Sequence, residues 1–213
     1  MNMLLNMKNN YFWYLLFTGI LLFSCNKKEG NGKDQILYKS FSPIIDIQSV
    51  RYDTVQNHTI CSVVVPVPSD SSISYDLDLN DDQTADFRLV VAHSEYNGGY
   101  CGHCSVFTYN IYVTGLSEEN KIANSGDYSV ARIFNESAVI DLNNNWSSRG
   151  DLLLQGGCAL PVSASFEEGY FGVRIKDAVG YIKIKRLDKN GIRIIEQGFN
   201  KTKNSGIICG QQE

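Results

Sequence analysis

Short runs of β-branched and aromatic residues recur along most of the chain, separated by clusters of Gly, Asn, Asp and Ser. In the clearest run, 181–185, aromatic or aliphatic residues alternate with lysines, which puts Ile on one face of a strand and Lys on the other. This period of two indicates strands buried on one side, and helical periodicity is scarce. The predicted strands are 44–50, 60–65, 73–79, 87–92, 106–114, 128–134, 170–175, 181–186 and 192–197.

The spacing of these strands predicts a single all-β domain over 36–213, a two-sheet β-sandwich or jelly roll with long loops. The Asp-Lys-Asn-Gly segment 188–191 supplies a turn that joins the two last strands as a hairpin. Long loops are expected at 115–126 and 142–157, with a turn of helix at 137–142. The sequence shows neither an internal repeat nor a second domain.

The N-terminal segment has a different composition. Lys8 is the only charged residue before Cys25, and the apolar run 11–23 is shorter than the ~20 residues that span a bilayer. This pattern predicts a cleaved signal peptide over 1–24. The run ends in Leu-Phe-Ser-Cys at 22–25, which resembles the lipobox of bacterial lipoproteins, where the Cys thiol receives a diacylglycerol. The alternative is an ordinary secretory signal followed by a chance cysteine.

Residues 25–35 are polar and contain Gly, which predicts a flexible tether with a root-mean-square reach of about 17 Å. Asn26 replaces the Asp that marks inner-membrane retention, and Lys-Lys-Glu at 27–29 resembles the charged export signals of Bacteroidota surface lipoproteins. The sequence therefore predicts a lipid anchor at Cys25 in the outer membrane, with the domain facing outside. The membrane is then the first partner, through the anchor.

Three segments in order resemble a family of secreted and lipid-anchored Bacteroidota proteins. Segment 76–87, Asp-Leu-Asp-Leu-Asn-Asp-Asp-Gln-Thr-Ala-Asp-Phe, resembles the family's D-L-N-G-D-G-x-x-D-F segment. Tyr-Phe-Gly-Val-Arg-Ile at 170–175 resembles its Y-I-G-V-R-F strand, and Val-Gly-Tyr-Ile-Lys-Ile at 179–184 its Y-G-W-I-R-I strand, with Tyr181 in place of Trp. The resemblance implies an all-β, secreted or anchored domain without an assigned activity.

The acidic segment has a spacing that suits calcium. Oxygen-bearing residues stand at relative positions 1, 3, 5, 7 and 9, as Asp78, Asn80, Asp82, Thr84 and Asp86. Gln83 replaces the usual Gly at position 6, and Leu89 replaces the bidentate Glu at position 12, so this is not a full EF-hand. Two interpretations stay open: a weak calcium loop between two strands, or a solvated acidic turn capped by Asx interactions.

Cysteine usage favours structural disulfides. Once Cys25 is assigned to lipid, the disulfide candidates are Cys61, Cys101, Cys104, Cys158 and Cys209. Cys-Gly-His-Cys at 101–104 matches the dithiol of disulfide isomerases, but Asn-Gly-Gly precedes it and a strand-like segment follows, where a redox site needs a helix. A redox enzyme at this pair and a zinc site that also recruits His93 or His103 are the alternatives.

Other function classes find less support. The net charge of −4 lacks the basic footprint of a nucleic-acid binder. The adjacent acids Glu167 and Glu168 would face opposite ways on a strand, unlike a glycosidase pair. Tyr96, Tyr100 and Trp146 are candidates for stacking on sugars, with packing as the alternative. The sequence thus predicts a non-catalytic binding or structural domain with a protein or glycan ligand, and an exported oxidoreductase or carbohydrate-active hydrolase as the alternative.

Overall fold

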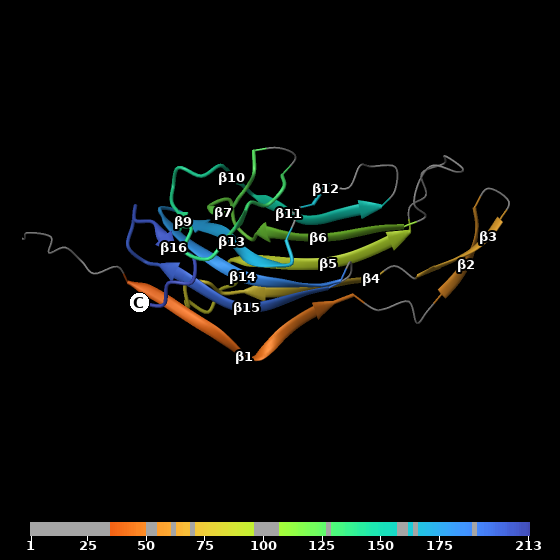
Figure 1. Ribbon diagram of the computed structural model, residues 1–213, viewed down its shortest axis with the longest axis horizontal. Coiled ribbons are helices and arrows are strands. Elements are labelled where there is room, and N and C mark those ends of the chain that lie inside the picture. Colours follow the sequence, from red (N-terminus) through yellow and green to blue (C-terminus); the bar gives the residue numbers. More distant parts are fainter. Residues whose placement is uncertain are drawn as a thin grey trace, which may run out of the picture. The chain divides into compact units, whose positions relative to one another are not determined.

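The computed structural model describes residues 35–49, 55–60, 63–68, 71–95, 107–126, 129–156, 162–163, 166–188 and 191–213. Within these ranges every regular element is a β-strand, which confirms the all-β prediction (Figure 1). The chain separates into two units, and the second, Asp34–Glu213, contains all the strands. The described ranges hold no helix that is both long and apolar enough to span a bilayer.

The largest sheet has seven antiparallel strands in the order β1-β15-β14-β13-β7-β10, with β8 as a further neighbour of β13. Its strands are β1 (Ile36–Gln48), β7 (Asn120–Ala123), β8 (Ile133–Phe134), β10 (Trp146–Ser147), β13 (Glu168–Ile175), β14 (Ala178–Asp188) and β15 (Gly191–Asn200). The pairing of β14 with β15 confirms the predicted hairpin.

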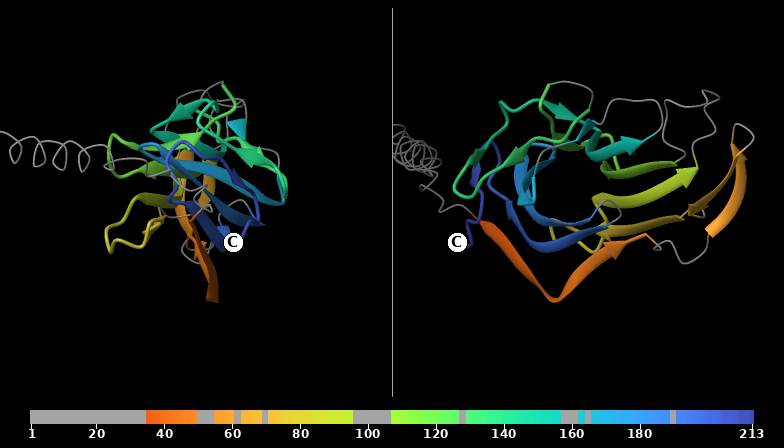
Figure 2. Two further views of the ribbon diagram at one scale, coloured as in Figure 1. Left: turned by 90° about the vertical axis from the view of Figure 1, so that its left-hand side faces the viewer. Right: turned by 45° about the vertical axis from the view of Figure 1, so that its right-hand side comes forward.

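A second antiparallel sheet has five strands in the order β12-β11-β6-β5-β4. They are β4 (Ser71–Leu77), β5 (Phe87–Glu95), β6 (Phe107–Gly115), β11 (Arg149–Gly156) and β12 (Val162–Ser163). Figure 2 shows the two larger sheets as curved layers. Two small two-stranded sheets complete the domain: β2 (Val55–Ile60) with β3 (Val63–Pro68), and β9 (Val139–Ile140) with β16 (Ile207–Ile208).

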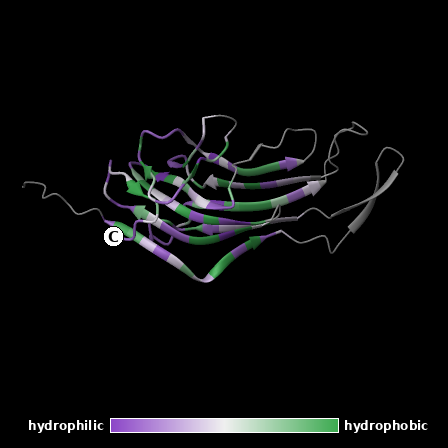
Figure 3. Cartoon of the chain, viewed as in Figure 1, coloured by the Kyte–Doolittle hydropathy of each residue, from purple (hydrophilic) through white to green (hydrophobic). Residues whose placement is uncertain are grey.

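One hydrophobic core joins the two larger sheets. It combines Leu89 and Ile111 of the five-stranded sheet with Phe171, Ile182 and Ile184 of the seven-stranded sheet. Side chains along each of these strands point alternately to the core and to the opposite face, and Figure 3 shows hydrophilic positions between hydrophobic ones along the sheet. The face of the seven-stranded sheet that packs on this core is called the inner face below.

The outer face of the seven-stranded sheet is also buried over much of its area. A second cluster contains Tyr170 and Tyr181 of this face together with Ile140, Ile207 and Cys209. The last three belong to β9, β16 and the C-terminal end, so irregular chain segments cover this face. The predicted solvated lysine face of 181–185 is therefore only partly correct, because the Lys183 side chain is 22% exposed and Tyr181 is fully buried.

The predicted loops at 115–126 and 142–157 were wrong. The first contains β7, and the second contains β10 and all of β11. Both β7 and β10 are too short to show a period of two, so neighbouring strands define them more than their own sequence does. The segment 137–142 forms a turn and β9 in place of the predicted turn of helix.

Candidate functional site

The predicted calcium segment forms the loop between β4 and β5. The Asp78 carboxylate accepts backbone N–H groups from three consecutive residues, Asp81 at 2.8 Å, Asp82 at 3.2 Å and Gln83 at 2.7 Å. The Asn80 side-chain oxygen accepts the N–H of Asp82 at 3.0 Å. This end of the loop is therefore closed by its own side chains, as expected for Asx-type capping.

Asp82 continues the pattern towards β5. Its carboxylate accepts the N–H of Thr84 at 2.8 Å, and this bond, with the Asn80 side chain, holds the pKa of the Asp82 carboxyl below its ordinary value. Asp81 and Gln83 both have positive φ angles, 62° and 68°. Gln83 thus adopts the left-handed conformation for which calcium loops use Gly, at some cost in backbone strain.

Asp86, the last predicted ligand, is buried and anchors the loop. Its carboxylate accepts the Leu79 N–H at 2.9 Å, and its backbone oxygen accepts the Asn120 side chain at 2.7 Å. Removal from water raises the pKa of the Asp86 carboxyl, although the amide bonds oppose the shift. Leu79 is thereby held in the main core.

The loop brings the predicted oxygen ligands into one turn, but their oxygens are directed at backbone amides. Within the described ranges, no group of three or more His, Cys, Asp or Glu side chains is placed to hold a metal ion. The loop has the geometry of a capped acidic turn, and calcium binding at this loop stays a prediction.

Cys209 is a free, buried thiol. Burial raises the pKa of Cys209 to about 12, so the nucleophilic thiolate is scarce at neutral pH. A disulfide through Cys209 is therefore not part of this structure. The other disulfide candidates, Cys61, Cys101, Cys104 and Cys158, and the lipidation candidate Cys25 lie outside the described residues.

The sequence did not point to a tyrosine–glutamate cluster on the outer face. Glu196 accepts hydrogen bonds from Tyr38 at 3.0 Å and from Tyr170 at 3.4 Å. Lys183 pairs with Glu168 at 3.4 Å and lies over the Tyr170 ring. Burial is the main cause that raises the pKa of both tyrosines, so they donate these bonds as neutral phenols. The cluster ties β1, β13, β14 and β15 together.

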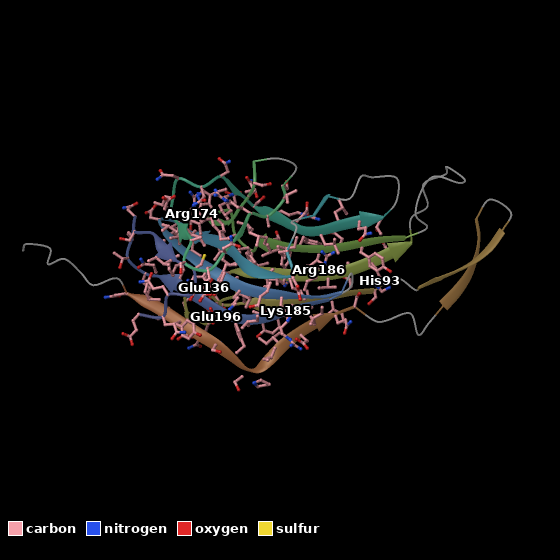
Figure 4. All side chains as sticks on the ribbon, viewed as in Figure 1. His93, Glu136, Arg174, Lys185, Arg186 and Glu196 are labelled. Carbon is pink, nitrogen blue, oxygen red and sulfur yellow. The ribbon has the colours of Figure 1, made fainter. Side chains whose placement is uncertain are left out.

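A basic surface on the outer face was also missed. Lys121 of β7 lies directly opposite Arg174 of β13, and the Arg174 guanidinium lies 5.3 Å from the ring centre of Trp146 (Figure 4). Trp146 donates its ring N–H to the Leu142 carbonyl at 3.2 Å and packs beside the second cluster, so the packing interpretation of this residue is correct. A surface depression of about 660 Å³ adjoins Lys121.

Several buried ionisable side chains of the described ranges have structural partners. Asp151 pairs with Arg149 at 2.8 Å, and a ring nitrogen of His93 lies 2.9 Å from the Ser49 hydroxyl. His93 and Glu196 lie towards opposite ends of the strands (Figure 4). Comparison with known proteins gives no match: no family model, no curated protein and no solved structure is similar to the chain.

Proposed function

We propose that the protein is a lipid-anchored lipoprotein of the outer membrane, exposed at the cell surface, whose β-sandwich domain is a non-catalytic binding or structural module. The lipid anchor is supported by the lipobox-like segment 22–25 and by the polar tether that follows it. It is also supported by the resemblance to anchored Bacteroidota proteins in segments 76–87, 170–175 and 179–184. An exported enzyme remains the alternative.

The proposal that the domain is non-catalytic is supported by the bonds that its buried ionisable groups make within the fold. Asp86 holds a backbone amide, Asp151 holds an arginine and Tyr181 donates to the Gln211 carbonyl at 2.7 Å. Catalytic acids and nucleophiles need a free face towards substrate and a pKa suited to proton transfer. Groups that are already bonded within the fold are suited to stability.

Mass spectrometry of the full chain, extracted from membranes with detergent, tests the anchor. We expect a chain that begins at Cys25 and carries acyl groups, and we expect Cys25→Ala to prevent this processing. Protease treatment of intact cells should degrade the wild-type domain if it faces outside. An unmodified, soluble chain that begins at another residue would refute the anchor.

Turnover assays separate the module from the enzyme. The alternative predicts reduction of insulin disulfides through Cys101 and Cys104, or release of reducing ends from polysaccharides. We expect neither from the full chain. Insulin reduction that is lost in Cys101→Ser would make the protein a thiol oxidoreductase and would overturn the non-catalytic module.

Calcium is a further part of the proposal. Its support is the ligand-like order of oxygens and the left-handed Gln83 at the position of the usual Gly. We expect millimolar calcium, compared with chelator, to raise the melting temperature of wild type and to leave Asp82→Ala unchanged, because ligand binding stabilises only the folded state. Equal melting of wild type in both buffers would leave the loop as a capped turn only.

A further inference from the structure

Like charges face each other on the outer face where Lys121 and Arg174 are direct cross-strand partners. Side chains so placed share one face with Cβ atoms about 5 Å apart, and like charges in this arrangement destabilise a sheet. Val179, the other partner of Arg174, is apolar. The pairing therefore costs stability unless something else neutralises it.

The same sheet shows how such a cost is usually removed. Lys185 and Arg193 are also direct partners, but an acid lies opposite each of them: Glu168, whose ion pair is with Lys183, lies opposite Lys185, and Asp46 lies opposite Arg193. Asp46 and Arg193 form a bidentate pair at 2.7 and 2.8 Å. Within the described ranges, the ion pairs involve neither Lys121 nor Arg174.

Arg174 is held in place without an acid. Its guanidinium lies over Trp146, and its buried Nε atom has no hydrogen-bond partner. A cation held on an aromatic ring keeps a fixed direction and its full charge. The planar guanidinium is the side chain best matched to a carboxylate, through two parallel hydrogen bonds.

A depression on the other side of Lys121 offers further polar groups, and Lys121 is the residue that it shares with the Lys121–Arg174 pair. It is lined by Gly115, Leu116, Ser117, Glu118, Lys121 and Ser148. It is a shallow depression of about 660 Å³ that is open to solvent. Two hydroxyls and a carboxylate can bond to ligand hydroxyls, and Leu116, 40% exposed, offers an apolar contact.

We propose that this surface binds an acidic sugar unit, a uronic acid, as part of a glycan. Lys121 and Arg174 bind the sugar carboxylate, Ser117, Glu118 and Ser148 bind its hydroxyls, and Leu116 contacts the apolar face of the ring. The proposal rests on the binding function proposed above and specifies its ligand.

Calorimetric titration of the full chain in detergent with trigalacturonate tests the site. We expect binding that weakens with added salt, and no binding of maltotriose, which lacks a carboxylate. Lys121→Gln and Arg174→Gln should each weaken binding by about tenfold or more, because each removes a charge-assisted bond. Arg174→Lys keeps the positive charge but loses the two parallel N–H donors, so its affinity should lie between those of wild type and Arg174→Gln. Lys203→Gln removes an exposed charge elsewhere and should bind like wild type.

Melting without ligand gives a second readout. Lys121→Gln should raise the melting temperature by up to about 3 °C, because it relieves the repulsion of Arg174. If Lys121 had a purely structural role, Lys121→Gln would instead lower the melting temperature. Absence of trigalacturonate binding by wild type, or equal binding by the variants, would overturn the site. Cleavage of trigalacturonate, or failure of Cys25 acylation, would overturn the proposed function while the variant comparison still decides the site.

Discussion

The inner face of the seven-stranded sheet is buried by a second sheet, whereas its outer face is buried by irregular segments of the same chain. Most inner positions are aliphatic or aromatic hydrocarbons, such as Phe171, Ile182 and Ile184, and the buried Gln197 opposite Ile182 is a polar exception. The outer positions include Tyr170 and Tyr181, whose rings meet edge to face with centres 5.3 Å apart. The centres of both faces are thus buried from solvent, but the side chains that fill them differ in chemistry.

This difference shows two ways of stabilising one sheet. The inner hydrocarbon side chains contribute through the apolar area that they bury, at roughly 25 cal/mol per Å². An outer tyrosine must also find an acceptor for its hydroxyl, and Tyr181 finds it on the backbone of Gln211. The outer face therefore depends on the position of the C-terminal segment, and the inner face does not.

The largest effect is expected on the inner face. Ile182→Ala removes a fully buried side chain from the shared core and should lower the free energy of unfolding by about 3 kcal/mol. Urea denaturation measures it. Ile208→Ala is the matched control, because Ile208 is 45% exposed and should lose less than about 1 kcal/mol. Similar losses at both positions would contradict the burial of Ile182.

The next effect concerns close packing on the outer face. A Cβ atom at Gly198 would overlap the ring of Tyr181, which is fully buried and has no space to move. Gly198→Ala should therefore cost about 2 kcal/mol in urea denaturation. The same change in a Tyr181→Leu background should cost less, because the ring is absent. Equal costs in both backgrounds would show that the ring does not lie over Gly198.

A smaller effect isolates the hydroxyl of the outer face. Tyr181→Phe keeps the ring but leaves the Gln211 carbonyl without this donor, so we expect a loss of about 1 kcal/mol. Hydrogen exchange should accelerate in the C-terminal segment 207–213 and remain unchanged on the inner strands. Tyr75→Phe, on the edge strand β4, serves as the control. Uniform acceleration across the domain would argue against a separate outer face.

The smallest effect is a pH dependence of the difference in free energy of unfolding between wild type and Tyr181→Phe. Burial raises the pKa of Tyr181 above its ordinary value of 10.0. Above pH 10 the unfolded chain therefore releases this proton while the folded chain keeps it, and the stabilising contribution is lost as pH rises through the folded pKa. The gap between wild type and Tyr181→Phe should narrow by up to about 1 kcal/mol from pH 10 to pH 11 in urea titrations. A constant gap would place Tyr181 in contact with water.

The inner face could be predicted from sequence because a period of two is a local property. The strands around Ile182 and Ile194 were found in this way, and so was their hairpin. In β1, Pro43 interrupts the run, and only the half that follows it was predicted. The burial of Tyr181 could not be predicted, because it depends on a segment about 30 residues further along the chain.

The acidic loop and the basic surface differ in the same way. The oxygen ligands from Asp78 to Asp86 are close in sequence, so their shared turn was predictable, although the amides they bind were not. Lys121 and Arg174 are far apart in sequence and meet only through the register of β7 and β13. Predicting this pair from the sequence would have required predicting β7, a four-residue strand that is too short to show a period of two.

The β2–β3 hairpin has two edges of unequal chemistry. Ile60 pairs with Val63, which follows it by three positions in the sequence, so hydrogen-bonded and non-hydrogen-bonded pairs alternate outward from that pair. Pro66 and Pro68 then occupy positions whose backbone nitrogen faces away from β2, and proline has no hydrogen to offer there. An approaching strand from another molecule would find too few donors along β3. Because this segment is rich in valine, the two prolines disfavour aggregation by strand addition along that edge.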